Sequence, residues 1–188
     1  MGDPNAWMVF VDGENFTIRG QAVANQANCP LTEGTYYKRD RFLWIKGTYA
    51  TAPIYGDPNP IRFRATRAYY YTSVTGDDQQ LDSIRKTLWG LGFSPQVFKR
   101  IQGQQKAKGV DIALTKDMLS HAFLGNYGVA VLVAGDGDYV PLIEEVKRLG
   151  KRVHLVFFEG EGLNPKLKLA SDEFLDVTRQ FLERWRSR

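Results

Sequence analysis

An apolar segment that ends directly in acidic residues is the feature that most constrains this chain. Residues 129–134, Val-Ala-Val-Leu-Val-Ala, are followed by Gly135, Asp136, Gly137 and Asp138. A strand that is apolar at every position is typical of the centre of a parallel sheet, where both faces are buried. Open α/β sheets bind ligands at the carboxyl ends of such strands. The segment therefore predicts an acidic site at that edge of a sheet.

The start of the chain repeats this pattern. Residues 7–11, Trp-Met-Val-Phe-Val, form a second apolar run, and Asp12 follows it in a turn that can open a helix. If the two strands are neighbours, Asp12 and Asp136 converge at one edge of the sheet. Like charges close together are costly unless a cation lies between them. We therefore expect Mg²⁺ or Mn²⁺ at this edge.

A third acid, Asp111, lies in a predicted helix that follows a polar loop. At about 100° per residue, Leu114 and Met118 fall within roughly 60° of Asp111, so this carboxylate lies on the stripe that should face the sheet. Asp117 points roughly 120° away from Asp111 by the same count, and it is predicted to be a solvated helix residue.

Strand and helix patterns alternate along the chain. Short connections and right-handed crossovers favour a mainly parallel sheet with helices on both faces, which is a doubly wound, three-layer α/β/α fold. Further strands are expected at 67–72, 94–99 and 152–158, with a brief one near Phe174, and helices at 78–91, 139–149, 164–169 and 179–186.

Three motifs carry a resemblance to a known family. They are Val-Asp-Gly-Glu-Asn at 11–15, Lys-Gly-Val-Asp at 108–111 and Gly-Asp-Gly-Asp-Tyr at 135–139. In this order and context the chain resembles the NYN domain, a branch of the PIN-like nuclease superfamily. The resemblance continues as far as 170–174 and is weak between 25 and 64. Each motif alone is common, but three in the family's order are a fairly specific signal.

The resemblance implies a metal-dependent ribonuclease with a PIN-like fold. Asp12, Asp111 and Asp136 resemble the family's catalytic, metal-binding acids. Asn15 resembles the asparagine that often follows the first acid, and would orient Asp12, a metal-bound water or a substrate phosphate. Asp138 is either a further metal ligand or the N-cap of the following helix, whose side chain accepts from a backbone N–H group.

The expected chemistry follows from the oxygen ligands. Carboxylates suit a hard divalent cation, and Mg²⁺ keeps some of its water and takes substrate phosphate oxygens to complete its shell. One metal-bound water becomes the nucleophile, and the metal also stabilises the charge that builds on the phosphate during hydrolysis of RNA. Because a fold does not confer activity, the alternative is a non-cleaving RNA-binding or regulatory module that keeps the metal pocket.

The charge balance supports a polyanionic partner. The chain has 25 basic and 21 acidic residues, a net charge of +4, and setting aside the four candidate aspartates leaves 25 basic against 17 acidic residues. Lysines and arginines near the acidic edge could bind the phosphates of single-stranded or structured RNA. Arg100, Lys106 and Lys108 are the candidates for these contacts, and a solvated loop is the alternative reading for Lys106 and Lys108.

An insertion at about 31–65 mixes aromatic and basic residues. Aromatic rings among cations suit single-stranded nucleic acid, because bases stack on the rings and phosphates meet the charges. Alternatively, the rings cover an edge of the core or form a surface on which two copies associate as a homodimer. A connection of this length without structure of its own is unusual, so a hairpin is expected between Tyr36 and Tyr49.

Length and composition set the outer bounds. A chain of 188 residues with 43% hydrophobic content is enough for one domain, and we expect residues 1–188 to form it. No stretch approaches the roughly 20 apolar residues that cross a bilayer, so no membrane partner is expected. No secretory signal is visible. Cys29 is the single cysteine, which excludes an internal disulfide or a cysteine-based zinc site and favours a cytoplasmic setting.

Overall fold

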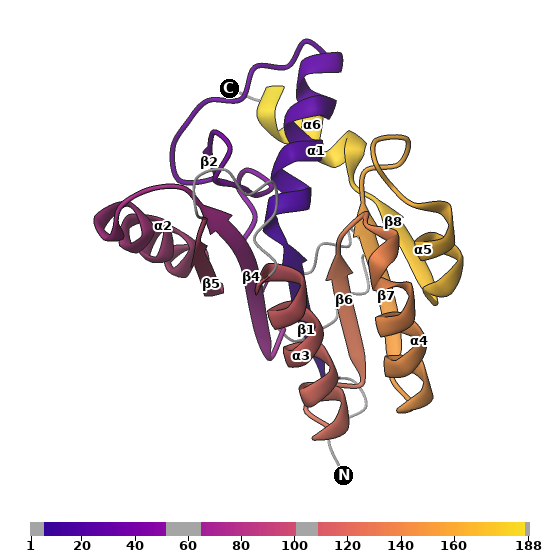
Figure 1. Ribbon diagram of the computed structural model, residues 1–188. Coiled ribbons are helices and arrows are strands. Elements are labelled where there is room, and N and C mark those ends of the chain that lie inside the picture. The colour runs from indigo at the N-terminus through magenta and orange to yellow at the C-terminus, as the bar shows by residue number, and fades with distance from the viewer. Residues whose placement is uncertain (1–5, 52–64, 101–108, 187–188) are drawn as a thin grey trace.

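The computed structural model describes residues 6–51, 65–100 and 109–186, and its centre is a twisted parallel sheet (Figure 1). In the described residues the strand order of this sheet is β5-β4-β1-β6-β7-β8, and every neighbouring pair is parallel. The strands are β1 Trp7–Asp12, β4 Arg67–Val74, β5 Ser94–Lys99, β6 Val129–Val133, β7 Arg152–Phe157 and β8 Glu173–Asp176.

Helices cover both faces of this sheet. Along β1, the side chains of Val9 and Val11 belong to one apolar core and those of Met8 and Phe10 to the other, because successive strand residues point to opposite faces. The first core contains residues of α1 (Gly13–Gln26), α2 (Asp78–Gly90) and α6 (Thr178–Arg186). The second contains residues of α3 (Gly109–Phe123), α4 (Val140–Arg148) and α5 (Pro165–Ala170). The predicted three-layer α/β/α fold is confirmed.

The sheet has a topological switch point between β1 and β6. From β1 the chain moves outward to β4 and β5, then crosses to β6 on the other side of β1 and continues to β7 and β8. The order of connections therefore reverses between β1 and β6, which pair in register from Trp7 with Val129 to Val11 with Val133. Doubly wound sheets bind ligands in the crevice at such a switch point, outside the carboxyl ends of the strands. Asp12 ends one of these strands, and Asp136 follows the other.

The predicted hairpin between Tyr36 and Tyr49 is present but short. It pairs β2 (Tyr37–Lys38) with β3 (Phe42–Leu43) in antiparallel order. The Tyr70 hydroxyl fastens it to β4, since this group accepts from the backbone N–H of Leu43 at 3.0 Å and donates to the backbone carbonyl of Leu43 at 2.9 Å.

The aromatic residues of the insertion mostly serve the core. Tyr37, Phe42 and Trp44 are buried in the first apolar core, so these rings do not form an exposed stacking platform. The alternative in which they cover the core is confirmed for these three residues. Tyr49 is the exception, because it is 63% exposed. The part of the insertion from 52 to 64 lies outside the described residues.

Candidate active site

Asp12 is a buried acid at the carboxyl end of β1. It is 4% exposed, and its Oδ1 caps α1 by accepting from the backbone N–H of Asn15 at 3.0 Å. Burial raises the pKa of Asp12 from 3.8 to about 7, since a carboxylate loses its hydration there. The hydrogen bond from Asn15 opposes this rise, and repulsion from the carboxylate of Asp111 adds to it.

Tyr139 connects Asp12 to Asp111. It ends η1 (Gly137–Tyr139), and its buried hydroxyl lies 3.1 Å from Oδ2 of Asp12 and 3.0 Å from Oδ1 of Asp111. Burial raises the pKa of Tyr139 well above its usual range, so the hydroxyl stays neutral and donates. The hydroxyl has one proton and can donate it to only one of the two carboxylates at a time. The arrangement is therefore most favourable when Asp12 is protonated or binds a cation. We call Asp12, Asp111 and Tyr139 the acidic site.

Asp111 lies in the first turn of α3, as predicted. The buried residues Val110, Leu114, Met118 and Ala122 anchor this helix on the sheet, and the contact with Tyr139 shows that the Asp111 carboxylate lies on the inward side. A negative charge in the first turn also interacts favourably with the helix dipole. Asp12 and Asp111 therefore both contact the hydroxyl of Tyr139.

Asp136 lies in the loop that follows β6, beside the end of β1. The loop is tied to α1, because the side chain of Asn15 accepts from the backbone N–H of Gly135 at 3.0 Å. Asp136 caps the turn that follows, since its Oδ1 accepts from the backbone N–H of Asp138 at 3.1 Å. Asn15 thus connects the ends of β1 and β6, because its backbone N–H donates to Asp12 and its side chain accepts from Gly135.

Asp138 is exposed and is not an N-cap. The cap of η1 is Asp136, and the cap position of α4 is occupied by Tyr139, which makes no side-chain capping bond. The capping alternative for Asp138 was therefore wrong, because the chain enters a short 3₁₀ turn before the α-helix and the cap moves two residues earlier.

The prediction for Asp117 was also wrong. The carboxylate was expected to be solvated, but its side chain is 21% exposed and its Oδ2 accepts from the hydroxyl of Tyr71 at 3.0 Å. The helical angle alone did not reveal this contact, because β4 places the long Tyr71 side chain at the flank of α3. Asp117 remains outside the acidic site.

Arg100 follows β5 at the same edge of the sheet, and its guanidinium is already partnered. It pairs with Glu14 at 2.5 Å, and it also donates to the hydroxyl of Ser73. Ser73 in turn donates to Glu14 at 2.7 Å. Glu14 lies within the first motif, and its pairing could not be predicted from the sequence because Arg100 is 86 residues away in the chain. Lys106 and Lys108 lie outside the described residues.

The carboxylates of the acidic site are candidate ligands for a metal ion. Among them, no group of three His, Cys, Asp or Glu side chains lies close enough together to hold a metal ion. Asp12 and Asp111 nevertheless supply two carboxylates, and Mg²⁺ is often held by one or two, with water and substrate phosphate completing its shell. In the same part of the chain, no Lys or Arg forms an ion pair with Asp12. A buried carboxylate that forms no ion pair with the described lysines and arginines, with a second carboxylate close to it, fits a divalent cation.

Comparison with solved structures finds the same fold in another protein. A protein of unknown function from Vibrio parahaemolyticus RIMD 2210633 matches with a TM-score of 0.60 and 19% sequence identity, over 97% of this chain and 99% of that chain. Comparison with curated proteins found no significant match. In the described residues, no helix has both the length and the apolar character that a membrane crossing requires.

The family model for the NYN domain matches residues 6–178, nearly the whole chain. NYN domains are PIN-like and are generally nucleases. The match includes all three of the motifs identified above and the switch-point strands that carry the acids. The chain therefore belongs to the NYN domain family.

Proposed function

We propose that this protein is a metal-dependent ribonuclease that hydrolyses phosphodiester bonds of single-stranded or structured RNA. The observation that carries the proposal is the meeting of Asp12 and Asp111, which come from different elements and share the hydroxyl of Tyr139 at the switch point of the sheet. A buried acid is costly, and a buried acid whose pKa is raised, as that of Asp12 is, is typical of a functional site. Membership of a nuclease family supports the same reading.

The acids of the site would hold Mg²⁺ or Mn²⁺. Asp12 and Asp111 are the proposed ligands, with Asp136 and Asp138 in the adjacent loop as candidates to join them. When bound, such a cation lowers the pKa of water and neutralises charge on the scissile phosphate. Tyr139 positions the first two carboxylates, and the backbone N–H of Asn15 fixes the Asp12 side chain through its Oδ1.

Basic residues near the site would bind the RNA backbone. Arg100 is pre-oriented by Glu14 and Ser73, and its side chain is still 26% exposed. A planar guanidinium can share its donors between a carboxylate and a phosphate. Lys106 and Lys108 stay in the proposal on sequence grounds, because they precede the helix that carries Asp111.

A non-cleaving RNA-binding or regulatory module is the second candidate. It is favoured by the absence, in the described residues, of a three-residue metal cluster and by the pKa of Asp12, which leaves a large fraction of this acid protonated near neutral pH. In this case the pocket would contact RNA without hydrolysing it.

The first experiment incubates the purified protein with labelled single-stranded RNA or DNA and with Mg²⁺, Mn²⁺ or EDTA. Asp12→Asn and Asp136→Asn are purified identically, which excludes a contaminating nuclease. Asp82→Asn is the matched control, because Asp82 is an exposed acid on α2 that pairs with Arg85. Metal-dependent cleavage of RNA that is lost in the first two variants and kept in the control supports the ribonuclease. Binding of RNA without cleavage under every condition supports the second candidate.

A further inference from the structure

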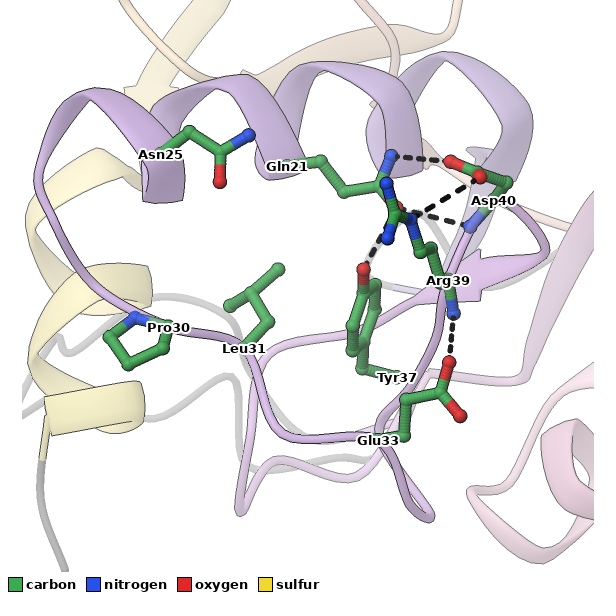
Figure 2. Close-up of a pocket in the computed structure, with 8 residues that line it drawn as sticks. All are labelled: Gln21, Asn25, Pro30, Leu31, Glu33, Tyr37, Arg39 and Asp40. Atoms are coloured by element: carbon green, nitrogen blue, oxygen red, sulfur yellow. Dashed lines mark hydrogen bonds and ion pairs between the residues drawn. The ribbon is translucent and has the colours of Figure 1, made fainter.

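A cavity lies between α1 and the hairpin loop, away from the acidic site. Its volume is about 470 Å³, within the usual range of ligand pockets, which is roughly 300–1,000 Å³. Gln21 and Asn25 of α1 form one wall, Leu31 lies across from them, and Tyr37 and Arg39 form the side nearest the hairpin (Figure 2). We call this cavity the α1 pocket.

Hydrogen bonds of the Gln21 side chain hold the wall of the α1 pocket in place. Its Oε1 accepts from the hydroxyl of Tyr37 and from the backbone N–H of Asp40, both at 3.0 Å, and its Nε2 donates to Oδ1 of Asp40 at 3.0 Å. These three bonds clamp the hairpin loop onto α1 (Figure 2). Because the wall is held in this way, a ligand does not have to order it, which lowers the cost of binding.

The groups that face the α1 pocket suit a nucleotide. The amide of Asn25 offers both a donor and an acceptor to the edge of a base, and Leu31 offers an apolar surface to its face. The guanidinium of Arg39 is 79% exposed beside Asp40, and its planar donors match the geometry of a phosphate. The carboxylate of Glu33 is neutralised by Lys38 at 2.9 Å, so it does not repel an anion strongly.

One face of α1 connects this pocket to the acidic site. At about 100° per residue, Glu14, Ile18, Gln21 and Asn25 lie within roughly 60° of one another. Glu14 lies in the first turn of α1 and pairs with Arg100, and Ile18, farther along the helix, is 52% exposed. Figure 1 shows α1 leading away from the carboxyl end of β1. With a rise of about 1.5 Å per residue, Asn25 lies about 20 Å along the helix from Asp12.

We propose that the α1 pocket binds a nucleotide of the RNA strand at a distance from the scissile phosphate. The base would lie between Asn25 and Leu31, and the phosphate would meet Arg39. A span of about 20 Å corresponds to roughly six stacked nucleotides at about 3.4 Å each. The inference deepens the proposed function and rests on it, since it takes RNA as the substrate and the acidic site as the place of cleavage.

The test measures binding of a fluorescein-labelled, single-stranded RNA of about twelve nucleotides by fluorescence anisotropy in EDTA. Asn25→Ala and Arg39→Ala remove exposed side chains and should leave the fold intact. Each is expected to weaken binding roughly tenfold, which is the effect of losing one good polar contact to a base or phosphate. A labelled RNA of about four nucleotides is too short to contact the acidic site and the pocket together, so it should bind the wild-type protein more weakly than the longer RNA.

Two control variants separate this site from general electrostatic attraction. Arg179 pairs with Glu183 and is 89% exposed, so Arg179→Ala removes the same charge as Arg39→Ala at a remote place. Gln79 is an exposed amide on α2 and matches Asn25. If Arg39→Ala and Arg179→Ala weaken binding equally, the pocket is not a nucleotide site. Crosslinks from 4-thiouridine RNA, mapped by mass spectrometry, should fall on residues 25–40, and crosslinks confined to other segments would overturn the proposal.

The outcome also separates this inference from the proposed function. If the wild-type protein does not cleave RNA but the pocket variants still bind it more weakly than their controls, the ribonuclease fails and the pocket stands. If cleavage depends on Asp12 while Asn25→Ala and Arg39→Ala bind and cleave like the controls, the ribonuclease stands and the pocket fails.

Discussion

The hydroxyl of Tyr139 lies 3.1 Å from Oδ2 of Asp12, although the two residues are 127 positions apart in the chain. This contact exists because β1 and β6 are neighbours, so the turn that follows β6 comes back over the end of β1. It makes the ionisation of Asp12 depend on Tyr139, since a hydrogen bond to a carboxylate favours its charged form.

Asp12→Asn should stabilise the metal-free protein at pH 8. The pKa of Asp12 is 3.8 when unfolded and about 7 when folded, so the folded state binds more protons between these values. The contribution of this acid to the free energy of unfolding is therefore fully present below about pH 4. It is lost as pH rises to about 7, at up to about 1.4 kcal/mol per pH unit. In urea unfolding with EDTA across this range, the free energy of unfolding of the variant should increase relative to that of the wild type as pH rises. A difference that does not change with pH would contradict the raised pKa.

Metal affinity should increase with pH below about 7. A cation requires the ionised form of Asp12, so binding releases a proton, and the affinity should change by up to about tenfold per pH unit in this range. Calorimetric titration with Mn²⁺ in buffers of different ionisation enthalpy measures the affinity and the proton release together. Asp12→Asn should bind weakly and without this pH dependence. An affinity that is equal at pH 5.5 and pH 7 would exclude Asp12 as a ligand.

Tyr139→Phe should shift the pH dependence of the site. Without the hydroxyl, the pKa of Asp12 should rise further, and the pH profile of RNA cleavage should move to higher pH. The loss of a buried donor should also lower the free energy of unfolding by about 1–3 kcal/mol at pH 8. Tyr127→Phe is the matched control, because its buried hydroxyl donates to the backbone carbonyl of Met118 at 2.8 Å, outside the acidic site. The control should lose stability without moving the pH profile, and a shift in both variants would refute the specific role of Tyr139.

Glu14 and Arg100 should be energetically coupled. Their side chains are 15% and 26% exposed, so solvent screens this ion pair less than the pairs on the surface. A double-mutant cycle with Glu14→Gln and Arg100→Met should give a coupling of about 1–2 kcal/mol in urea unfolding. The same cycle on the exposed pair Asp82 and Arg85 should give less than about 0.5 kcal/mol. Equal couplings in the two cycles would show that the Glu14 pair is an ordinary surface contact.

Gly13→Ala should destabilise the protein. A Cβ atom at this position would overlap the ring of Tyr70, which is buried and held by its hydrogen bonds to Leu43. Overpacking of this kind costs about 1–3 kcal/mol. Gly34→Ala is the control, because a Cβ atom there has no neighbour within 4 Å among the described residues. Thermal unfolding compares the two variants, and similar melting temperatures would show that Tyr70 can move aside.

The sequence by itself determined the layers and the place of the acids. Apolar runs that end in Asp12 and Asp136 predict buried parallel strands with acids at their carboxyl ends, because burial on both faces requires apolar side chains at every position. Helical periodicity placed Asp111 on the inward face of α3, and the structure bears this out through its contact with Tyr139. These predictions succeeded because they depend on residues close together in the chain.

The tertiary structure decided which side chains meet. The Tyr139 bridge, the pair of Glu14 with Arg100 and the bond from Tyr71 to Asp117 each join residues at least 28 positions apart. Neither periodicity nor motif spacing encodes such contacts, because they depend on strand order and on the reach of long side chains across elements. The same reason explains the insertion, whose aromatic residues look like a binding surface in sequence. Tyr70 fastens its hairpin to β4, and most of the described rings then become part of the core.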